Sequence, residues 1–273
     1  MLTLLPTPIG NIEDVTFRAL RVLEEAEVIL CEDTRVTKKL LHLLHKRCGL
    51  EHNVKRFISL HSHNELEVVG LFEKSFFDQN VVYMSDAGMP CISDPGAILV
   101  QYCIKNGIKY TVLPGPSAFV TAYAGSGFLD KEFVFFGFLP HKGKQREKQL
   151  QRVLSESYPV IIYESSHRLE KLLDELAKNI PNRVVFVAKE ITKKHEYYFK
   201  DEAIRLKEQI SKISLKGEWV VIISPDKINK SIPSITIQDI RSLDIPPKQK
   251  AKLLAKITNK SIKECYLELN MKN

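Results

Sequence analysis

The 273-residue sequence lacks the features that mark secreted and membrane proteins. Its five cysteines form no C-x-x-C pair and leave an odd total, so we expect free thiols in a reducing cytoplasm rather than a disulfide framework. No uninterrupted apolar run approaches the ~18 residues of a membrane span, and we expect no membrane partner. The segment Met1–Pro6 has no basic stretch before its apolar residues, which predicts a first strand rather than a signal peptide.

Several enzyme signatures are also absent. No G-x-G-x-x-G motif follows a predicted strand and no G-x-x-x-x-G-K-[ST] motif occurs, so the standard cradles for dinucleotides and triphosphates are missing. The sequence has neither the G-x-S-x-G elbow of α/β-hydrolases nor the H-E-x-x-H motif of zinc proteases. These absences are consistent with a ligand that carries no phosphate.

The composition is that of a soluble globular protein with a basic excess. Hydrophobic residues make up 44% and charged residues 27%, and the length allows two domains of ~150 residues each. The net charge is +7, and two segments carry the excess. Residues 226–273 hold ten Lys and Arg against five Asp and Glu, and residues 141–152 hold five against one. Such clusters favour a polyanionic partner, RNA or DNA first, with a solvated helix face as the alternative for each.

The stretch Val81–Gly96 is the one around which the chain is organised. Its first four residues are apolar, three of them β-branched or aromatic, and predict a buried strand. Two clusters rich in acid, glycine and proline follow, Asp86–Pro90 and Asp94–Gly96, and predict a rigid loop at the carboxyl end of that strand. Ligands bind at the carboxyl ends of strands in α/β sheets, so this loop is a candidate binding site; a turn without a ligand is the alternative.

Strands and helices alternate along most of the chain, which predicts an α/β protein. We expect strands at residues 2–5, 28–31, 81–84, 110–113, 133–137, 160–163, 184–188 and 219–223. We expect Asn11 or Asp14 to cap the first helix and Asp33 or Thr34 to cap the second. Beyond the last strand, residues 248–257 and 261–269 predict two short helices. The predicted domains are therefore 1–116, 117–225 and a basic helical tail at 226–273.

The segment Ser59–Glu65 places two histidines and a glutamate close together in the sequence. In an extended chain His61, His63 and Glu65 share one face, which is one geometry for a metal site. No fourth ligand is spaced to join them, so we expect a polar loop that faces the substrate and no metal.

Short motifs recur at or just after the predicted strand ends. They are Thr7-Pro-Ile-Gly-Asn11, Glu32-Asp-Thr-Arg35, His61-Ser-His-Asn-Glu65, Ser85-Asp-Ala-Gly-Met-Pro90, Ser93-Asp-Pro-Gly96, Pro114-Gly-Pro-Ser117, Gly137-Phe-Leu-Pro140, Tyr163-Glu164, His167-Arg168, Glu190, Thr192-Lys193 and Gly217-Glu218. In order and spacing, from Leu2 to about Pro225, the set resembles the ribosomal RNA small subunit methyltransferase I family within the tetrapyrrole methylase superfamily. The tail resembles the small C-terminal domain of that family more loosely.

The resemblance implies a two-domain α/β fold of the tetrapyrrole methylase type, with a small helical C-terminal extension, that assembles as a homodimer. It implies S-adenosylmethionine as cofactor, no metal, and 2′-O-methylation of a cytidine in the decoding region of small-subunit rRNA, free or in the 30S subunit. The family pattern implies cofactor contacts at Pro8, Asp86, Ala87, Gly88, Met89, Ile92, Ser117, Ala118, Tyr163 and Ala188. Met89 departs from the family, which usually has a small threonine at that position.

Methyl transfer to a ribose hydroxyl needs in-line positioning and a group that accepts the hydroxyl proton. The candidates that follow strands within family motifs are Glu32, Asp33, Arg35, His63 and Glu164. The sequence leaves the base open between Glu32, His63 and Glu164. We favour Glu32, with Asp33 and Arg35 orienting it or the target nucleotide, because His63 lies in a segment suited to positioning substrate and Glu164 lies where cofactor is expected.

Two other functions stay open at this point. A relative within the superfamily that methylates a tetrapyrrole or another small molecule would have no use for the basic segments. A ribosome-associated protein that binds RNA without catalysis would keep those segments but would not need the motifs of the predicted cleft.

Overall fold

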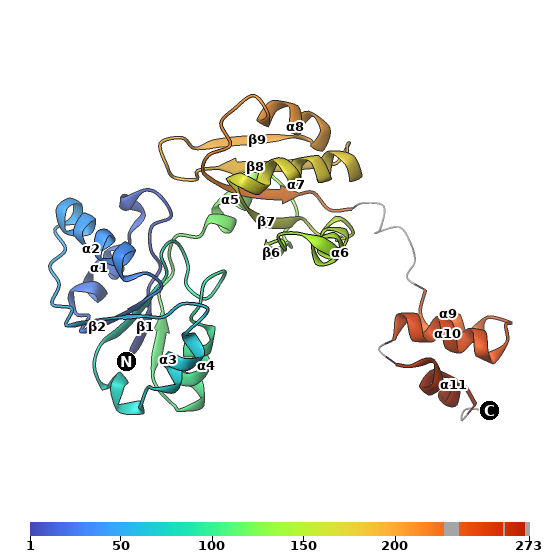
Figure 1. Cartoon of the computed structure of the whole chain (residues 1–273), viewed down its shortest axis with the longest axis horizontal. Helices are drawn as coiled ribbons and strands as arrows, with labels where there is room; N and C mark the ends of the chain where they lie inside the picture. The colour runs from blue at the N-terminus through green and yellow to red at the C-terminus, as the bar shows by residue number, and fades with distance from the viewer. Residues whose placement is uncertain (227–234, 259, 271–273) are drawn as a thin grey trace. The chain divides into compact units, whose positions relative to one another are not determined.

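The computed structural model describes residues 1–226, 235–258 and 260–270 (Figure 1). Its contacts divide the chain into two compact units, Met1–Pro225, here the large unit, and Asp226–Asn273, here the small unit. The predicted division of the large unit at 116/117 stays a prediction. Parts of the predicted basic tail, at 227–234, 259 and 271–273, lie outside the described residues.

A parallel five-stranded sheet in the order β3-β2-β4-β1-β5 organises the first half of the large unit (Figure 1). Its strands are β1 (Leu2–Leu4), β2 (Val28–Cys31), β3 (Arg56–Ser59), β4 (Val81–Met84) and β5 (Tyr110–Val112). Every residue of β1, β2 and β4 is buried, which explains why their sequences are nearly continuous apolar runs without alternation.

Helices cover both faces of this sheet. On one face, α1 (Phe17–Glu24) and α2 (Thr34–Cys48) pack through Leu23 and Leu41 against Ile29 and Val82. The other face carries α3 (Glu65–Gly70), the 3-10 helix η2 (Lys74–Asp78) and α4 (Ala97–Lys105). The sheet is therefore the middle layer of three.

Two of the predicted helix caps can be compared with the structure. Asp33 caps α2 as predicted, because its side chain accepts a hydrogen bond from the backbone N–H of Arg35 at 2.8 Å. The prediction for α1 is wrong: Asn11 caps the 3-10 helix η1 (Ile12–Asp14), and Thr16 caps α1 by accepting from the N–H of Ala19 at 3.0 Å. Thr16 is an ordinary capping residue that the apolar periodicity did not mark.

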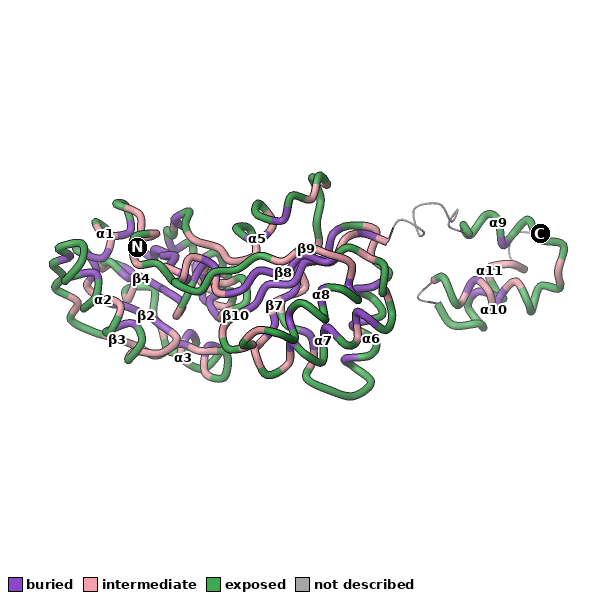
Figure 2. The backbone as a smooth tube through the Cα atoms, turned by 90° about the horizontal axis from the view of Figure 1, so that it is seen from above, coloured by how far each residue is buried: buried purple, intermediate pink, exposed green. Residues whose placement is uncertain are grey.

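The second half of the large unit is built on a mixed sheet in the order β6-β7-β10-β8-β9. Its strands are β6 (Val134–Phe138), β7 (Val160–Ser165), β8 (Val184–Lys189), β9 (Tyr197–Glu202) and β10 (Glu218–Ile223). Only β6 and β7 are parallel; the other neighbours are antiparallel. Figure 2 shows β7, β8 and β10 as a largely buried layer.

Helices α6 (Gly143–Leu154), α7 (Ser166–Asn179) and α8 (Ala203–Ile210) pack on one face of the mixed sheet, and α5 (Ala118–Ser126) packs on the other. Strands β3 and β9 were not predicted. Both are edge strands, and β9 exposes Tyr197 and Tyr198, so neither carries the buried apolar pattern by which the other strands were found.

The small unit contains α9 (Ile237–Ser242), α10 (Pro247–Ile257) and α11 (Ile262–Asn270). Ile240, Ala251, Leu254 and Cys265 form its core. The two predicted helices of the tail are confirmed, and α9, begun by a capping box from Thr236 to Asp239, was missed because it is short. Among the described residues, no helix is both long enough and apolar enough to cross a membrane.

Candidate functional site

The loops that follow β1, β2, β4 and β5 meet at one edge of the first sheet, because parallel strands end on the same side. The loop after β4, here the central loop (Ser85–Gly96), is anchored at its far end by Glu65. The buried Oε1 of Glu65 accepts hydrogen bonds from the backbone N–H groups of Gly96, Ile98 and Leu99 at 2.9, 3.0 and 3.2 Å. These are the first N–H groups of α4, so a carboxylate supplied by α3 caps the helix that holds the loop in place.

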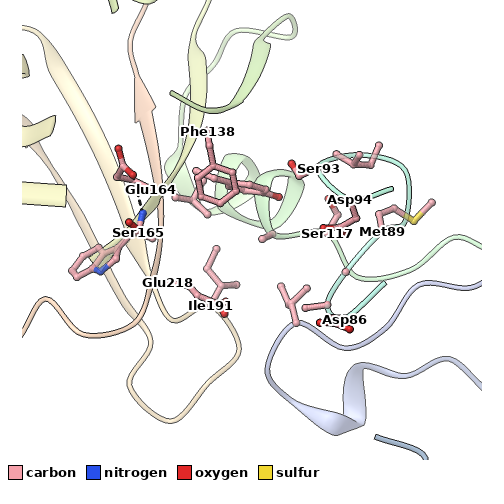
Figure 3. Close-up of a pocket in the computed structure, with 18 of the residues that line it drawn as sticks. Asp86, Met89, Ser93, Asp94, Ser117, Phe138, Glu164, Ser165, Ile191 and Glu218 are labelled. Carbon is pink, nitrogen blue, oxygen red and sulfur yellow. Dashed lines mark hydrogen bonds between the residues drawn. The ribbon is translucent and has the colours of Figure 1, made fainter. Parts of the chain in front are cut away.

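A cavity of about 370 Å³ lies between the central loop and the end of the mixed sheet. Figure 3 shows residues of the two halves of the large unit on opposite sides of it, with Asp86 and Asp94 on one side and Glu164 and Glu218 on the other. The lining residues are Ile9, Asp86, Ala87, Gly88, Met89, Ile92, Ser93, Asp94, Ser117, Ala118, Phe138, Tyr163, Glu164, Ser165, Ser166, Ile191, Gly217, Glu218, Trp219 and Val220.

The charge of this lining is one-sided. It contains four carboxylates and no Lys, Arg or His side chain. The rest is apolar or carries hydroxyl groups, and the size is that of a small-molecule site. Two of these carboxylates have basic partners outside the lining, Glu164 in Arg168 and Glu218 in Lys193. Asp86 and Asp94 are therefore the groups that favour a cationic ligand and disfavour a phosphate.

Gly88 lets the backbone of the central loop come close to the first loop of the chain. Its N–H and C=O pair with those of Thr7 at 3.0 Å each, and its φ is +85°. A Cβ at this position would lie 3.2 Å from Cγ2 of Ile9, which lines the cavity. Glycine is therefore required here both for the backbone conformation and for the open space beside Ile9.

Three carboxyl groups cluster at the carboxyl ends of β2 and β4. Burial, followed by the negative charges of Asp94, Asp86 and Asp33, raises the pKa of Glu32. Burial is also the largest cause of the raised pKa of Asp86 and of Asp94. A hydrogen bond from the backbone N–H of Asp33 to Oδ1 of Asp86, at 3.2 Å, ties the first turn of α2 to this cluster.

Asp33 and Arg35 form an ion pair with each other. The Nη2 of Arg35 lies 2.6 Å from Oδ2 of Asp33, and the same carboxylate caps α2. The Arg35 side chain and then its backbone N–H lower the pKa of Asp33 to about 2. Asp33 is therefore a fully ionised structural group and a poorer proton acceptor than Glu32.

Glu164 lies on the wall of the cavity but is held by cations from behind. Its carboxylate is buried, 2.9 Å from Nε of Arg168 and 3.8 Å from Nη1 of the buried Arg146. The N–H of Ser165 donates to Oε1 at 2.9 Å. This set of partners fits an orienting group of the wall better than a group that takes up a proton.

Aromatic side chains form one wall. Tyr163 contacts Phe135 and Phe138, with ring centroids 5.0 and 5.6 Å apart. The Tyr163 hydroxyl accepts from the N–H of Phe119 at 3.2 Å, and burial raises the pKa of Tyr163 to about 12. Its hydroxyl therefore stays protonated and can donate into the site.

The loop after β8 closes the cavity on the side of the mixed sheet. Glu190 and Thr192 adopt positive φ values of 52° and 64°, and Oγ1 of Thr192 accepts from the N–H of Asn11 at 3.0 Å. Oε1 of Glu190 accepts from the N–H of Glu218 at 2.9 Å. Strained non-glycine residues at such a position are a mark of functional sites.

The predicted cofactor residues fall into two groups. Eight line the cavity: Asp86, Ala87, Gly88, Met89, Ile92, Ser117, Ala118 and Tyr163. Pro8 and Ala188 do not: Ile9 takes the place next to Pro8, and Ala188 is fully buried in the core that Ile9 joins. Of the predicted catalytic residues, only Glu164 is part of the lining. Glu32, Asp33 and Arg35 lie at the edge of the cavity beside Asp86. His63 does not line the cavity.

His63 is exposed on the loop between β3 and α3. His61, His63 and Glu65 do not share one face, because Glu65 begins α3 and turns inward to cap α4. No group of three or more His, Cys, Asp and Glu that could hold a metal occurs within the described part of the chain.

Sequence reasoning missed several lining residues that lie in the motifs quoted for the resemblance. Ser93, Asp94, Phe138, Gly217 and Glu218 are all of this kind, so their motifs were the available signal. Trp219 gave no such signal, since it reads as a strand residue, and Ile191 lies between the quoted residues Glu190 and Thr192 without belonging to a motif.

The basic segment 141–152 is only partly available to a ligand. Arg146 is 2% exposed, lies 2.7 Å from Oε2 of Glu175 through its Nη2, and donates to the carbonyl oxygen of Pro140. Lys142, Lys144 and Lys148 are exposed. Arg146 is therefore a structural residue. Only the exposed lysines of the segment can contact an anionic partner, so the prediction for the whole segment is corrected to that extent.

Two comparisons with known proteins agree on the family. The family model described as Tetrapyrrole (Corrin/Porphyrin) Methylases matches residues 1–206. The chain is 49% identical over 270 residues to the protein named ribosomal RNA small subunit methyltransferase I from Campylobacter fetus, covering 98% of this chain and 99% of that one. It is 45% identical over 281 residues to the protein of the same name from Helicobacter pylori strain J99, covering 98% and 96%.

Solved structures share the fold at low sequence identity. Uroporphyrin-III C-methyl transferase from Thermus thermophilus, in complex with S-adenyl homocysteine, aligns with a TM-score of 0.56 at 16% identity, covering 85% of this chain and 99% of that chain. Diphthine synthase aligns with a TM-score of 0.59 at 16% identity, covering 82% and 89%. The predicted fold class, α/β of the tetrapyrrole methylase type with a helical C-terminal part, is confirmed.

Proposed function

The chain belongs to the tetrapyrrole (corrin/porphyrin) methylase family and, within it, to the ribosomal RNA small subunit methyltransferase I proteins, and on that premise we propose that it transfers a methyl group from S-adenosylmethionine to small-subunit ribosomal RNA. The observation that carries the proposal is the cavity that Asp86 and Asp94 line and that no basic side chain lines. S-adenosylmethionine is a cation at its sulfonium, carries no phosphate, and has a purine and two ribose hydroxyls, so it fits this lining.

Within that site, each wall has a distinct task. The backbone of Ala87, Gly88 and Met89 can approach the cofactor closely, because Gly88 supplies the conformation and the space. Asp86 and Asp94 stabilise positive charge at the central loop, and the aromatic wall at Phe138 and Tyr163 excludes water. The bound cofactor supplies an activated methyl group on sulfur, so the protein needs to align the acceptor oxygen rather than to activate the donor.

The proton of the acceptor hydroxyl needs a base at the edge of the cavity, and we assign Glu32 to this role. Its raised pKa makes it a better acceptor than an ordinary carboxylate, whereas Asp33 is committed to Arg35 and Glu164 to Arg168. Arg35, whose side chain is 89% exposed, is placed to orient the target nucleotide.

The finer features of the proposal follow the family resemblance. The acceptor is the 2′-hydroxyl of a cytidine in the decoding region, and the 2′-hydroxyl also distinguishes RNA from DNA. The enzyme works in the cytoplasm, where its rRNA is found, and its domains are 1–116, 117–225 and 226–273. The family resemblance also implies a homodimer.

Label transfer tests the function directly. The full chain is incubated with S-adenosylmethionine labelled in its methyl group, together with 30S subunits or free small-subunit rRNA, and the labelled nucleoside is identified after nuclease digestion. We expect label in a 2′-O-methylcytidine. Label in a tetrapyrrole acceptor with none in RNA would instead support small-molecule methylation, and cofactor-independent RNA binding with no transfer would support a non-catalytic role.

A further inference from the structure

The exposed face of α2 is strongly basic, and α2 lies outside the two basic segments identified from the sequence. Residues 34–56, which include α2, hold seven Lys and Arg against one Glu. This excess is larger than that of either the segment 141–152 or the segment 226–273. The prediction that two segments carry the basic excess was therefore incomplete, because the charges of α2 are spread among apolar residues and form no run.

Helical spacing gathers these charges on one side. Thr37, Leu41 and Leu44 are buried against the first sheet. Arg35, Lys39, His42 and Lys46, at intervals of four, three and four residues, are exposed and lie on the opposite side of the helix. With 15 residues, α2 is about 22 Å long, and basic side chains follow its whole exposed face.

Only some of these charges have acidic neighbours, among them His45, whose Nδ1 lies 3.4 Å from Oε1 of Glu51. No Asp or Glu occurs within α2. Among the residues that the structure describes, Arg35 pairs with its own cap Asp33 and Lys55 pairs with Glu27, whereas Lys39, Lys46 and Arg47 form no ion pair. An ordinary solvated helix face carries both acidic and basic side chains. A face with basic side chains alone favours an anionic partner.

A shallow hollow runs beside the basic face. It is lined by Lys38, Leu41, His42, His45, Leu50, Glu51, His52 and Phe57. The Nζ of Lys38 lies over the Phe57 ring, 5.1 Å from its centre, so a base that stacks there would displace or share the ring with this flexible cation. Aromatic rings beside basic side chains are the surfaces on which single-stranded nucleic acids stack their bases.

The basic face is continuous with the proposed methyl-transfer site. Asp33, which caps α2, donates its N–H to Asp86, and Asp86 lines the cavity. Arg35 in the first turn is therefore next to the site, and Lys46 lies 11 residues further along the helix, about 16 Å away.

We propose that the exposed face of α2 binds the sugar–phosphate backbone of single-stranded RNA and guides it toward the cavity, and that the hollow beside Phe57 takes an unstacked base. This inference rests on the proposed function and specifies where its RNA substrate docks. The backbone contacts read no sequence, so the surface contributes affinity and direction rather than choice of nucleotide.

A pair of triple variants tests the docking surface. The first is Lys39→Gln, Lys46→Gln and Arg47→Gln on α2; the matched control is Lys105→Gln, Lys171→Gln and Lys178→Gln, which removes the same charge from exposed positions on α4 and α7. Binding to free small-subunit rRNA is measured from 50 to 300 mM salt, with calorimetry of S-adenosylmethionine binding alongside. The α2 variant is expected to reduce the slope of log K against log salt by about 2, at about 0.7 per phosphate, and to weaken binding tens of fold at 150 mM salt, while the control stays near wild type.

The outcomes separate this inference from the function on which it rests. Wild-type methyl transfer to RNA, together with equal RNA affinity and salt slope in both variants, would overturn the α2 surface and leave the function standing. An α2 variant that binds free rRNA normally but no longer methylates 30S subunits would assign the face to an acidic protein and would also overturn the proposal. Loss of S-adenosylmethionine binding in the α2 variant would show that the face supports the cavity and does not dock RNA. Absence of transfer by the wild-type chain would count against the function itself.

Discussion

At the scale of single residues, the site places carboxyl groups where burial and mutual repulsion raise their pKa values. Glu32, Asp86 and Asp94 share this environment, and each is shifted in the direction that favours the protonated form. Proteins keep such an arrangement where it serves binding or proton transfer, since it lowers stability at neutral pH.

Glu32→Gln tests the proton acceptor. We expect single-turnover methyl transfer to fall by about 10²–10⁴-fold with the affinities for cofactor and RNA unchanged, because the amide keeps the shape and cannot accept a proton. The wild-type rate is expected to fall as pH drops through the pKa of Glu32, which lies above its ordinary value of 4.5. The rate of the variant should not fall over this pH range. Transfer at the wild-type rate would make Glu32 structural, and Glu164 and His63 would be tested next.

Asp94→Asn tests how much the acid cluster lowers the stability of the fold. The folded-state pKa of Asp94 is raised, so its ionised form destabilises the fold at neutral pH, and this cost disappears as pH falls below the unfolded-state pKa of ~3.9. The variant is therefore expected to have a higher Tm than wild type at pH 7, with the difference vanishing toward pH 4, and about tenfold weaker S-adenosylmethionine binding. Asp78→Asn, at an exposed carboxylate, is the control. An unchanged Tm at pH 7 would contradict the assignment.

At the scale of elements, the capping of α4 by Glu65 determines where the central loop sits. The three N–H groups that its Oε1 serves belong to the segment in which the loop ends, so loss of the carboxylate would leave them without a partner inside the protein. This contact joins α3 to α4 across a distance of about 30 residues in the sequence, and no local pattern predicts it.

Glu65→Ala is expected to destabilise the large unit by about 3 kcal/mol, at ~1 kcal/mol for each buried N–H left unpaired. The matched control is Glu67→Ala, an exposed residue of the same helix, which should change the free energy of unfolding by less than about 0.5 kcal/mol. Urea unfolding measures both. Equal effects of the two substitutions would show that the cap does not hold the loop.

Several strands were predictable because β1, β2, β4, β7, β8 and β10 are buried on both faces and their sequences are nearly continuous apolar runs. Edge strands β3 and β9 gave no such signal. The part of the site made by the central loop was predictable for the same reason, since the loop follows a buried strand. The lining from Trp219 depends on how the mixed sheet faces the loop, and long-range packing of that kind leaves no local pattern.

At the scale of the whole molecule, basic side chains occur in the small unit as well as on α2. Lys248, Lys252 and Lys256 are exposed along α10 at four-residue intervals. Replacing all three with Gln should reduce the salt slope of RNA binding by about 2 and leave S-adenosylmethionine affinity unchanged. A slope equal to that of wild type would show that the small unit does not contact phosphate.

We propose that the acid-lined cavity of the large unit binds S-adenosylmethionine. Hydrogen–deuterium exchange of the full chain, with and without saturating S-adenosylmethionine, tests it most directly and needs no substitution. We expect slower exchange at residues 85–94, 117–119, 163–166 and 217–220, where the lining residues lie, and little change in α6, α8 and the described part of the small unit. Protection confined to other segments, or none at a concentration that calorimetry shows to be saturating, would contradict the account.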